Sequence, residues 1–205
     1  MTSVIVKEES SVSRDARRKM IESAVTLLAM RGLQGTAFSE VLERSGAPRG
    51  SIYHHFPKGK DELVDAAIEL SGQRALAVLD EVEGASPSEI TAYFLGLWRE
   101  ILVRSNLRAG CAVLAVSVAT DSPGLLEHAA AIFRAWTSRL TGLYVAAGIE
   151  PERASSFATT LVAASEGAVV LSRAQRSLEP FEQVASLLLE TTPGRRKLSP
   201  GRPRT

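Results

Sequence analysis

The chain has 205 residues, a net charge of +1 and 45% hydrophobic residues, values typical of a folded soluble protein with one or two domains. Its longest apolar stretches, around residues 109–119 and 161–171, are interrupted by Ser, Glu or Gly and are shorter than a membrane span. The start MTSVIVKEESS lacks the basic start and apolar core of a signal peptide, and the single cysteine excludes an internal disulfide. We therefore expect a cytoplasmic protein without membrane contact.

Charge is distributed unevenly along the chain. Residues 1–60 carry ten Lys and Arg against six Asp and Glu, residues 61–194 carry nine against seventeen, and residues 195–205 carry five against none. The local balances are +4, −8 and +5. A basic N-terminal module and a basic tail thus flank an acidic body, and local fields of this kind steer proteins toward DNA.

Hydrophobic periodicity predicts an all-α fold of about nine helices, since no segment shows sustained strand alternation. Residues 1–13 are expected to form a flexible N-terminal arm. Residues 14–31 then form a first amphipathic helix, with Met20, Ala24 and Leu27 on one side.

The segment GAPRGSIYHHFPKGKDEL carries the clearest functional pattern. Ser39 is predicted to cap a short helix that ends at Gly46, and Pro48 to open a second short helix that ends near Phe56. Ile52 and Phe56 lie four residues apart, so they can pack inward together. Two short helices joined by a glycine-containing turn form a helix-turn-helix.

The other face of the second helix carries side chains that can donate to phosphates or base edges, and a glycine that lets the backbone approach a duplex. Hydroxyl and lysine side chains on either side add further phosphate donors. The predicted DNA-contacting residues are Thr36, Ser39, Arg49, Gly50, Ser51, Tyr53, His54, Lys58 and Lys60.

The segment allows two other interpretations. A helical hairpin with a solvated basic face is the simpler one, because most charge runs are solvated. Metal binding by His54 and His55 is disfavoured, because adjacent helical residues point about 100° apart and no Cys or His cluster joins them. We predict no metal and no cofactor.

The region resembles the TetR family of one-component transcriptional repressors. More than a dozen positions match the family's pattern in order and spacing: Gly32, Thr36, Gly46, Pro48, Arg49, Gly50, Ser51, Ile52, Tyr53, His55, Phe56, Lys60, Asp61 and Leu63. One extra residue within residues 57–60 is similar to the LmrA/YxaF-like branch, which controls multidrug export genes. The resemblance implies a DNA-binding domain over residues 14–60 and a ligand-binding and dimerisation domain over residues 61–192.

The resemblance also places an inducer pocket in the body, where most of the chain's aromatic residues occur. The candidate ligand-binding residues are Phe94, Trp98, Cys111, Phe133, Trp136, Phe157 and Glu166. Each aromatic residue could instead fill the core, and Cys111 could be a small buried hydrophobe or a redox sensor. Glu100, His128 and Glu166 could bind a cationic or polar ligand group, or could be paired structurally.

The last two predicted helices favour a homodimer. Ala163, Ala164, Gly167 and Ala168 allow close helix approach, and Phe157, Leu161, Leu171, Val184, Leu187 and Leu188 supply apolar surface. The tail over residues 193–205, PGRRKLSPGRPRT, is expected to be disordered. It could bind the minor groove like an AT-hook or only add nonspecific phosphate affinity.

The sequence therefore predicts a repressor that binds a near-palindromic operator as a dimer and is released by a small apolar or aromatic inducer. The alternative functions are a nonspecific nucleoid-type DNA-binding protein and an enzyme. An enzyme is disfavoured, because nucleophile elbows, phosphate loops, dinucleotide turns and metal clusters are all missing from the sequence.

Overall fold

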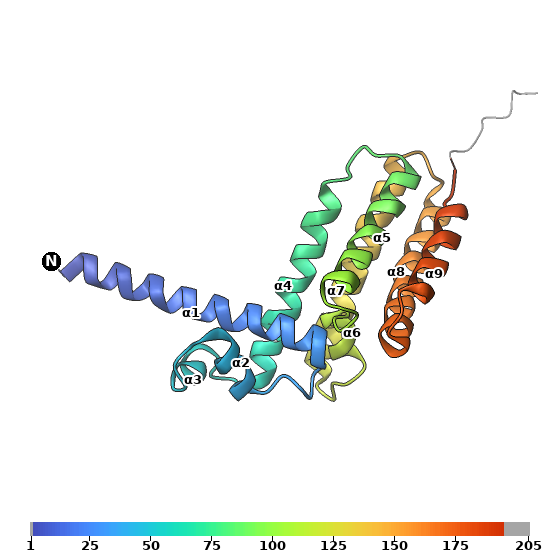
Figure 1. Cartoon of the computed structure of the whole chain (residues 1–205). Helices are drawn as coiled ribbons and strands as arrows, with labels where there is room; N and C mark the ends of the chain where they lie inside the picture. Colours follow the sequence, from blue (N-terminus) through green and yellow to red (C-terminus); the bar gives the residue numbers. More distant parts are fainter. Residues whose placement is uncertain (1, 195–205) are drawn as a thin grey trace, which may run out of the picture.

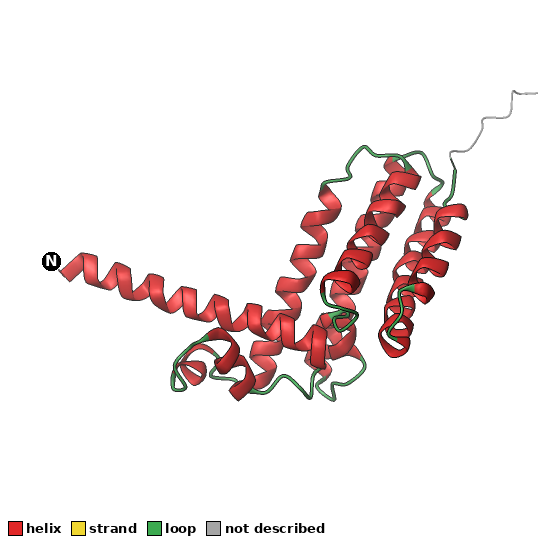
Figure 2. Cartoon of the chain, in the orientation of Figure 1, coloured by secondary structure: helices red, strands yellow, loops and turns green. Residues whose placement is uncertain are grey.

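The computed structural model describes the backbone of residues 2–194 and the side chains of residues 13–194. Within this part of the chain there are nine α-helices and no strand (Figure 2), which confirms the all-α prediction. The helices are α1 (Thr2–Arg31), α2 (Phe38–Ser45), α3 (Ser51–His55), α4 (Lys60–Asp80), α5 (Pro87–Arg104), α6 (Ala112–Ser117), α7 (Pro123–Ala146), α8 (Pro151–Gln175) and α9 (Glu179–Glu190). Residues 195–205 of the predicted tail lie outside the described residues.

Helix α1 lies across one end of a bundle that the later helices form (Figure 1). Helix α1 runs across the lower part of the molecule, with α2 and α3 beside it, and α4 leads from this end up along the bundle. Helices α8 and α9 form the right-hand edge of the bundle. The helix-turn-helix therefore lies at one end of the molecule.

Two buried clusters hold this arrangement together. The first joins α1, α2, α3 and α4 to α6 and α7, and includes the fully buried Met20, Ile52 and Phe56. The second lies among α5, α7, α8 and α9 around Tyr144, whose hydroxyl is 2.7 Å from Thr91 Oγ1. The first cluster continues past residue 60, so the helix-turn-helix shares its core with the body.

Three predicted helix starts differ from the structure. Helix α1 begins at Thr2, so the residues expected to form a flexible arm continue the helix. Helix α2 begins at Phe38 after the extended Ala37, without a side-chain cap, so Ser39 as the cap is wrong: it lies inside the first turn. Helix α3 begins only at Ser51, because Arg49 and Gly50 form a turn.

Helices α4 and α7 approach closely at Gly72. A Cβ atom at this position would lie 2.9 Å from Ile132 Cγ2, and the Gly72 carbonyl accepts a 3.1 Å hydrogen bond from Trp136 Nε1. The glycine is therefore required for close packing and for the placement of Trp136.

Helix α8 is long and apolar enough to cross a membrane by length and composition, and 44% of its most apolar window is buried inside the protein. It packs against α5, α7 and α9. Its buried side thus belongs to the second cluster, and its other side is exposed.

Candidate functional site

The helix-turn-helix is built as the local sequence predicts. Gly46 ends α2 in the left-handed conformation, with φ of 68°, and its N–H donates to the Leu42 carbonyl at 3.0 Å. Ile52 and Phe56 are fully buried against α1 and α4, which fixes the inner face of α3. The opposite face is left free.

Most of the predicted DNA-contacting residues lie on this free face or next to it. Arg49, Gly50 and His54 are exposed, and the Tyr53 side chain is 68% exposed. The Tyr53 ring packs edge-on against Phe38, with ring centroids 5.6 Å apart, which orients the phenol without burying it. Ser39 and Lys58 are also exposed.

Three predicted contacts are instead used inside the protein. Thr36 is fully buried and its hydroxyl donates to the Gly32 carbonyl at 2.9 Å, so a phosphate contact for this side chain is wrong. Lys60 Nζ donates to the Leu33 carbonyl at 2.8 Å, and therefore holds the turn between α1 and α2. The half-buried Ser51 donates its hydroxyl to a carbonyl 2.6 Å away, that of Pro48.

The structure adds one cation, from α1, to the neighbourhood of α3. The Arg17 guanidinium lies 5.2 Å from the centroid of the Phe56 ring, so α1 brings a positive charge beside α3. Burial, together with His54 and Arg17, lowers the pKa of His55 below its usual value. His55 is therefore neutral near pH 7.

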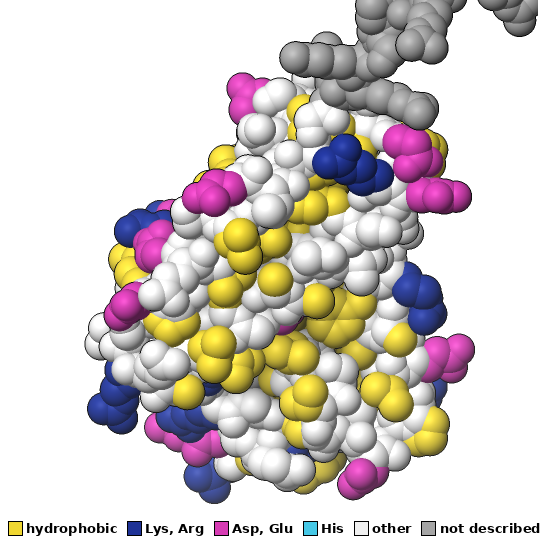
Figure 3. Space-filling view, turned by 90° about the vertical axis from the view of Figure 1, so that its right-hand side faces the viewer, with side chains coloured by type: hydrophobic (Ala, Val, Ile, Leu, Met, Phe, Trp, Pro, Cys, Tyr) yellow, Lys and Arg dark blue, Asp and Glu magenta, His cyan; other side chains and the backbone are white. Residues whose placement is uncertain are grey.

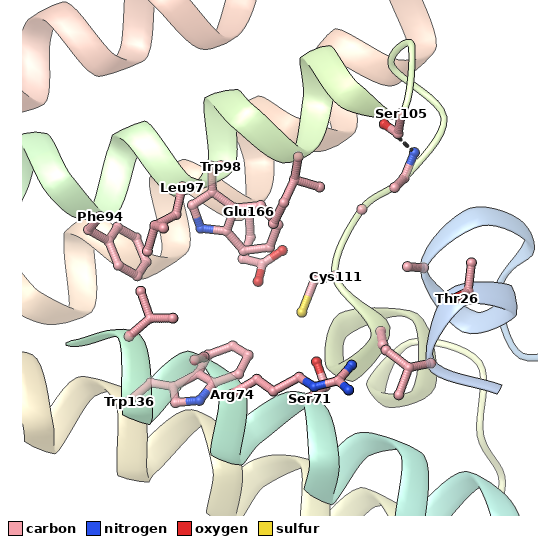
Figure 4. Close-up of a pocket in the computed structure, with 18 of the residues that line it drawn as sticks. Thr26, Ser71, Arg74, Phe94, Leu97, Trp98, Ser105, Cys111, Trp136 and Glu166 are labelled. Atoms are coloured by element: carbon pink, nitrogen blue, oxygen red, sulfur yellow. Dashed lines mark hydrogen bonds between the residues drawn. The ribbon is translucent and has the colours of Figure 1, made fainter. Parts of the chain in front are cut away.

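A cavity of about 540 Å³ lies between the helix-turn-helix end and the bundle (Figure 4). It is lined by residues of α1, α4, α5, α7 and α8, by the segment before α6 and by the first residue of α6. Of the predicted ligand-binding residues, five line it: Phe94, Trp98, Cys111, Trp136 and Glu166.

Phe133 and Phe157 do not line this cavity, so the prediction that they contact a ligand there is wrong. Phe133 packs edge-on against Trp136 and Phe157 against Tyr144, each at 5.4 Å between ring centroids. Both rings support residues of the core. Their apolar character alone does not distinguish this supporting role from a place on the cavity wall.

The sequence reasoning missed the contribution of α1 and α4 to the cavity. Val25 and Ala29 of α1, and Ala75 and Val78 of α4, line it. Their helical spacing marks an inward face. The spacing does not show that the space behind that face is partly empty.

Glu166 is the unusual polar group of this cavity. It is 7% exposed, and neither carboxylate oxygen has a hydrogen-bond partner of good geometry among the described residues. Burial raises the pKa of Glu166 to about 7, an effect that the nearby Cys111 thiol offsets in part. Figure 4 shows the carboxylate and the thiol pointing into the same space between Trp98 and Trp136.

Cys111 is a buried, neutral thiol. Burial and the adjacent Glu166 raise its pKa well above the usual value, and its sulfur accepts a hydrogen bond from the Leu114 N–H at 3.3 Å. Because the thiolate is the reactive form, this environment disfavours redox chemistry and favours the interpretation as a small buried residue.

The other two polar candidates do not line the cavity, and both are paired. Glu100 forms an ion pair with Arg104 at 2.6 Å. The two ring nitrogens of His128 lie 2.6 Å from Asp65 Oδ1 and 2.8 Å from Glu69 Oε2, so this side chain connects α7 to α4. No three His, Cys, Asp or Glu side chains come together as a metal site within residues 13–194.

The exposed side of α8 and α9 forms an apolar face (Figure 3). Hydrophobic side chains gather over the middle of this view, and most charged side chains lie toward its edges. Ala163, Gly167, Val170, Leu171 and Leu187 are exposed here. Three residues expected at the dimer contact are buried within the subunit and belong to its core: Leu161 and Leu188, expected to supply apolar surface, and Ala168, expected to allow close helix approach.

An all-α chain with an exposed recognition helix and a helical body that encloses a cavity has the construction of a helix-turn-helix transcriptional regulator. The profile described as bacterial regulatory proteins, tetR family, matches residues 20–67. That described as transcriptional regulator LmrA/YxaF-like, C-terminal domain, matches residues 87–187.

Relatives and solved structures agree with these matches. The HTH-type transcriptional regulator Rv0196 of Mycobacterium tuberculosis is 37% identical over 190 residues, which cover 87% of this chain and 97% of the relative. LmrA of Bacillus subtilis is 27% identical over 178 residues, 85% of this chain and 95% of LmrA. The crystal structure of regulatory protein TetR from Rhodobacter sphaeroides has a TM-score of 0.77 at 19% identity, covering 85% of this chain and 97% of that chain.

The chain belongs to the TetR family of bacterial transcriptional regulators and carries an LmrA/YxaF-like C-terminal domain. The predicted family is thus confirmed. Its members and the relatives found here are transcriptional regulators and not enzymes.

Proposed function

We propose that this protein is a ligand-responsive repressor that binds a near-palindromic operator as a homodimer and is released by a small, largely apolar ligand. One observation carries the proposal: the cavity is lined both by α1, which packs against the helix-turn-helix, and by the helices of the body. A ligand there would touch both parts at once. Such a regulator acts in the cytoplasm, on nucleoid DNA.

The DNA contact is assigned to the free face of α3. Arg49, Tyr53 and His54 would reach base edges and phosphates, with Lys58 and Arg17 at the sides. Two copies related by a two-fold axis would place these helices in successive major grooves, about 34–36 Å apart.

The dimer contact is assigned to the apolar face of α8 and α9. Leu171 and Leu187 are 49% and 60% exposed, and the neighbouring Ala163 and Gly167 carry no bulky side chain. A second copy packed on this face would form a four-helix bundle and cover the exposed side of α8.

Ligand and operator are coupled through the shared core. Helix α4 contacts α1 and α7 and lines the cavity, so a shift of α4 changes the position of α3 relative to the bundle. Linkage requires that ligand and operator weaken each other's binding by the same factor.

Fluorescence anisotropy with a labelled duplex from the region upstream of this gene tests the proposal. We expect specific binding over a scrambled duplex at fixed salt, and sedimentation of the protein as a dimer. Equal affinity for both duplexes would favour the nonspecific nucleoid-type alternative. The double variant Leu171→Glu with Leu187→Glu should sediment as a monomer, whereas Val118→Glu, at a 74% exposed position outside α8 and α9, should not.

A further inference from the structure

The cavity combines an apolar wall with one buried acidic group that lacks a partner. Buried carboxylates are normally paired or hydrogen-bonded, because desolvating an unpaired charge is costly. No hydrogen bond of good geometry reaches either Glu166 oxygen among the described residues, and the nearby Cys111 thiol is only a weak donor, although the side chain points into the cavity from α8. Its environment is therefore incomplete without a ligand.

The two cations of the cavity wall do not complete it. Arg74 forms an ion pair with Glu22 at 3.1 Å, and Arg104 with Glu100 at 2.6 Å. Both arginines are more than half exposed. Their charges are thus already compensated by carboxylates that do not line the cavity, whereas Glu166 forms no ion pair among the described residues.

The indole rings beside Glu166 favour a cation as the missing partner. Trp98 and Trp136 both line the cavity, and the Trp136 N–H is already bonded to the Gly72 carbonyl. The face of an indole ring has a negative electrostatic potential that attracts a cation, and the same face also packs against hydrocarbon. A neighbouring neutral thiol, Cys111, adds no competing charge.

We propose, building on the ligand response proposed above, that the cavity takes an amphiphilic amine, whose protonated nitrogen binds the Glu166 carboxylate and whose apolar body lies against Trp98 and Trp136. The amine supplies the hydrogen-bond donors that the protein does not provide. Glu166 then favours ligands with a positive charge, and the remaining cavity wall favours ligands with a large apolar body.

The two lining tryptophans are the only ones in the chain, so their fluorescence reports directly on the cavity. The full-length protein is titrated with phenylbutylamine and, separately, with phenylbutanol, which has the same apolar body without the charge. We expect the amine to bind at least about tenfold more tightly, as a charge-assisted hydrogen bond contributes that much. Equal binding, or no response to amine up to about 1 mM, would overturn the assignment.

Two variants separate the carboxylate from general effects. Glu166→Gln keeps the shape of the side chain and should abolish the preference for amine, with phenylbutanol affinity within about twofold of the original. Glu127→Gln removes an exposed carboxylate of α7 outside the cavity and should keep the preference. A preference for amine that survives Glu166→Gln would contradict the proposal.

Operator binding distinguishes this inference from the proposed function. If amine binding depends on Glu166 but leaves operator affinity unchanged, the amine site stands and the ligand response fails. If operator binding is specific but no amine preference exists, the repressor assignment stands and the amine site fails.

Discussion

The helix-turn-helix and the cavity differ in whether their less exposed polar side chains are hydrogen-bonded. In the helix-turn-helix, the hydroxyls of the buried Thr36 and the half-buried Ser51 are bonded to carbonyls three or four residues away, those of Gly32 and Pro48. In the cavity, helix packing brings Glu166 into an apolar space without a partner. The candidate DNA-contacting side chains are therefore exposed, whereas the candidate ligand-binding carboxylate is buried without a hydrogen bond of good geometry.

The largest effect is expected on operator affinity, from changes on the exposed face of α3 and the turn before it. Arg49→Ala combined with Tyr53→Ala should lower operator affinity by about two orders of magnitude, since each base or phosphate contact contributes about 1–3 kcal/mol. Both side chains are exposed, so the melting temperature should change little. Anisotropy and thermal unfolding measure the two quantities. A large loss of stability would show that these side chains support the fold instead.

The second prediction concerns the effect of the buried Glu166 carboxyl group on stability. The folded-state pKa of Glu166 is raised from 4.5 to about 7, so its burial destabilises the fold increasingly as pH rises through this window. Glu166→Gln should increase the free energy of unfolding at about pH 8 by up to about 3 kcal/mol, and by much less near pH 4. Denaturant unfolding at both pH values, at fixed protein concentration, measures this. An equal effect at both would contradict the pKa shift.

A third prediction concerns the contact that supports the cavity. Gly72→Ala places a methyl group 2.9 Å from Ile132 Cγ2, and should destabilise the fold by about 1–2 kcal/mol despite the better helix propensity of alanine. Gly96→Ala is the matched control, because nothing lies within 4 Å of its Cβ position in α5. This variant should gain about 0.5–1 kcal/mol. Parallel destabilisation of both would refute the close-packing argument.

The smallest effect is expected at the ion pairs of His128. Burial lowers its pKa, but hydrogen bonds and charges from Asp65 and Glu69 outweigh this and raise it above 6.5. Since the folded pKa is raised, the contribution is complete below 6.5 and is lost as pH rises through the folded pKa. His128→Gln should cost about 1 kcal/mol near pH 6, as for partly exposed ion pairs, and less near pH 9. A cost that grows with pH would contradict this sign.

The contrast also explains what could be predicted from sequence. Gly46, Ile52 and Phe56 follow local rules for turns and helix faces, and the structure places them as those rules predict. Thr36 and Lys60 also match the family's pattern, but their partners show that they hold the turn between α1 and α2. A motif identifies which residues matter and leaves open whether they face DNA or the core.

The cavity residues were only partly predictable. Phe94, Phe133 and Phe157 have the same apolar side chain, yet only Phe94 lines the cavity. Whether a ring borders empty space or another ring depends on the angle and distance between helices. Those quantities are set by contacts such as Gly72 with Ile132, which join residues far apart in the chain.

The sequence by itself determined the helices, the family and the helix-turn-helix, because turn residues, helix periodicity and motif spacing act over a few neighbouring residues. Only the tertiary structure decided that α1 and α4 help to line the cavity and that Glu166 is left there without a hydrogen-bond partner of good geometry. Burial and hydrogen-bond satisfaction depend on every helix that packs around a group, and so they emerge only when the chain is folded.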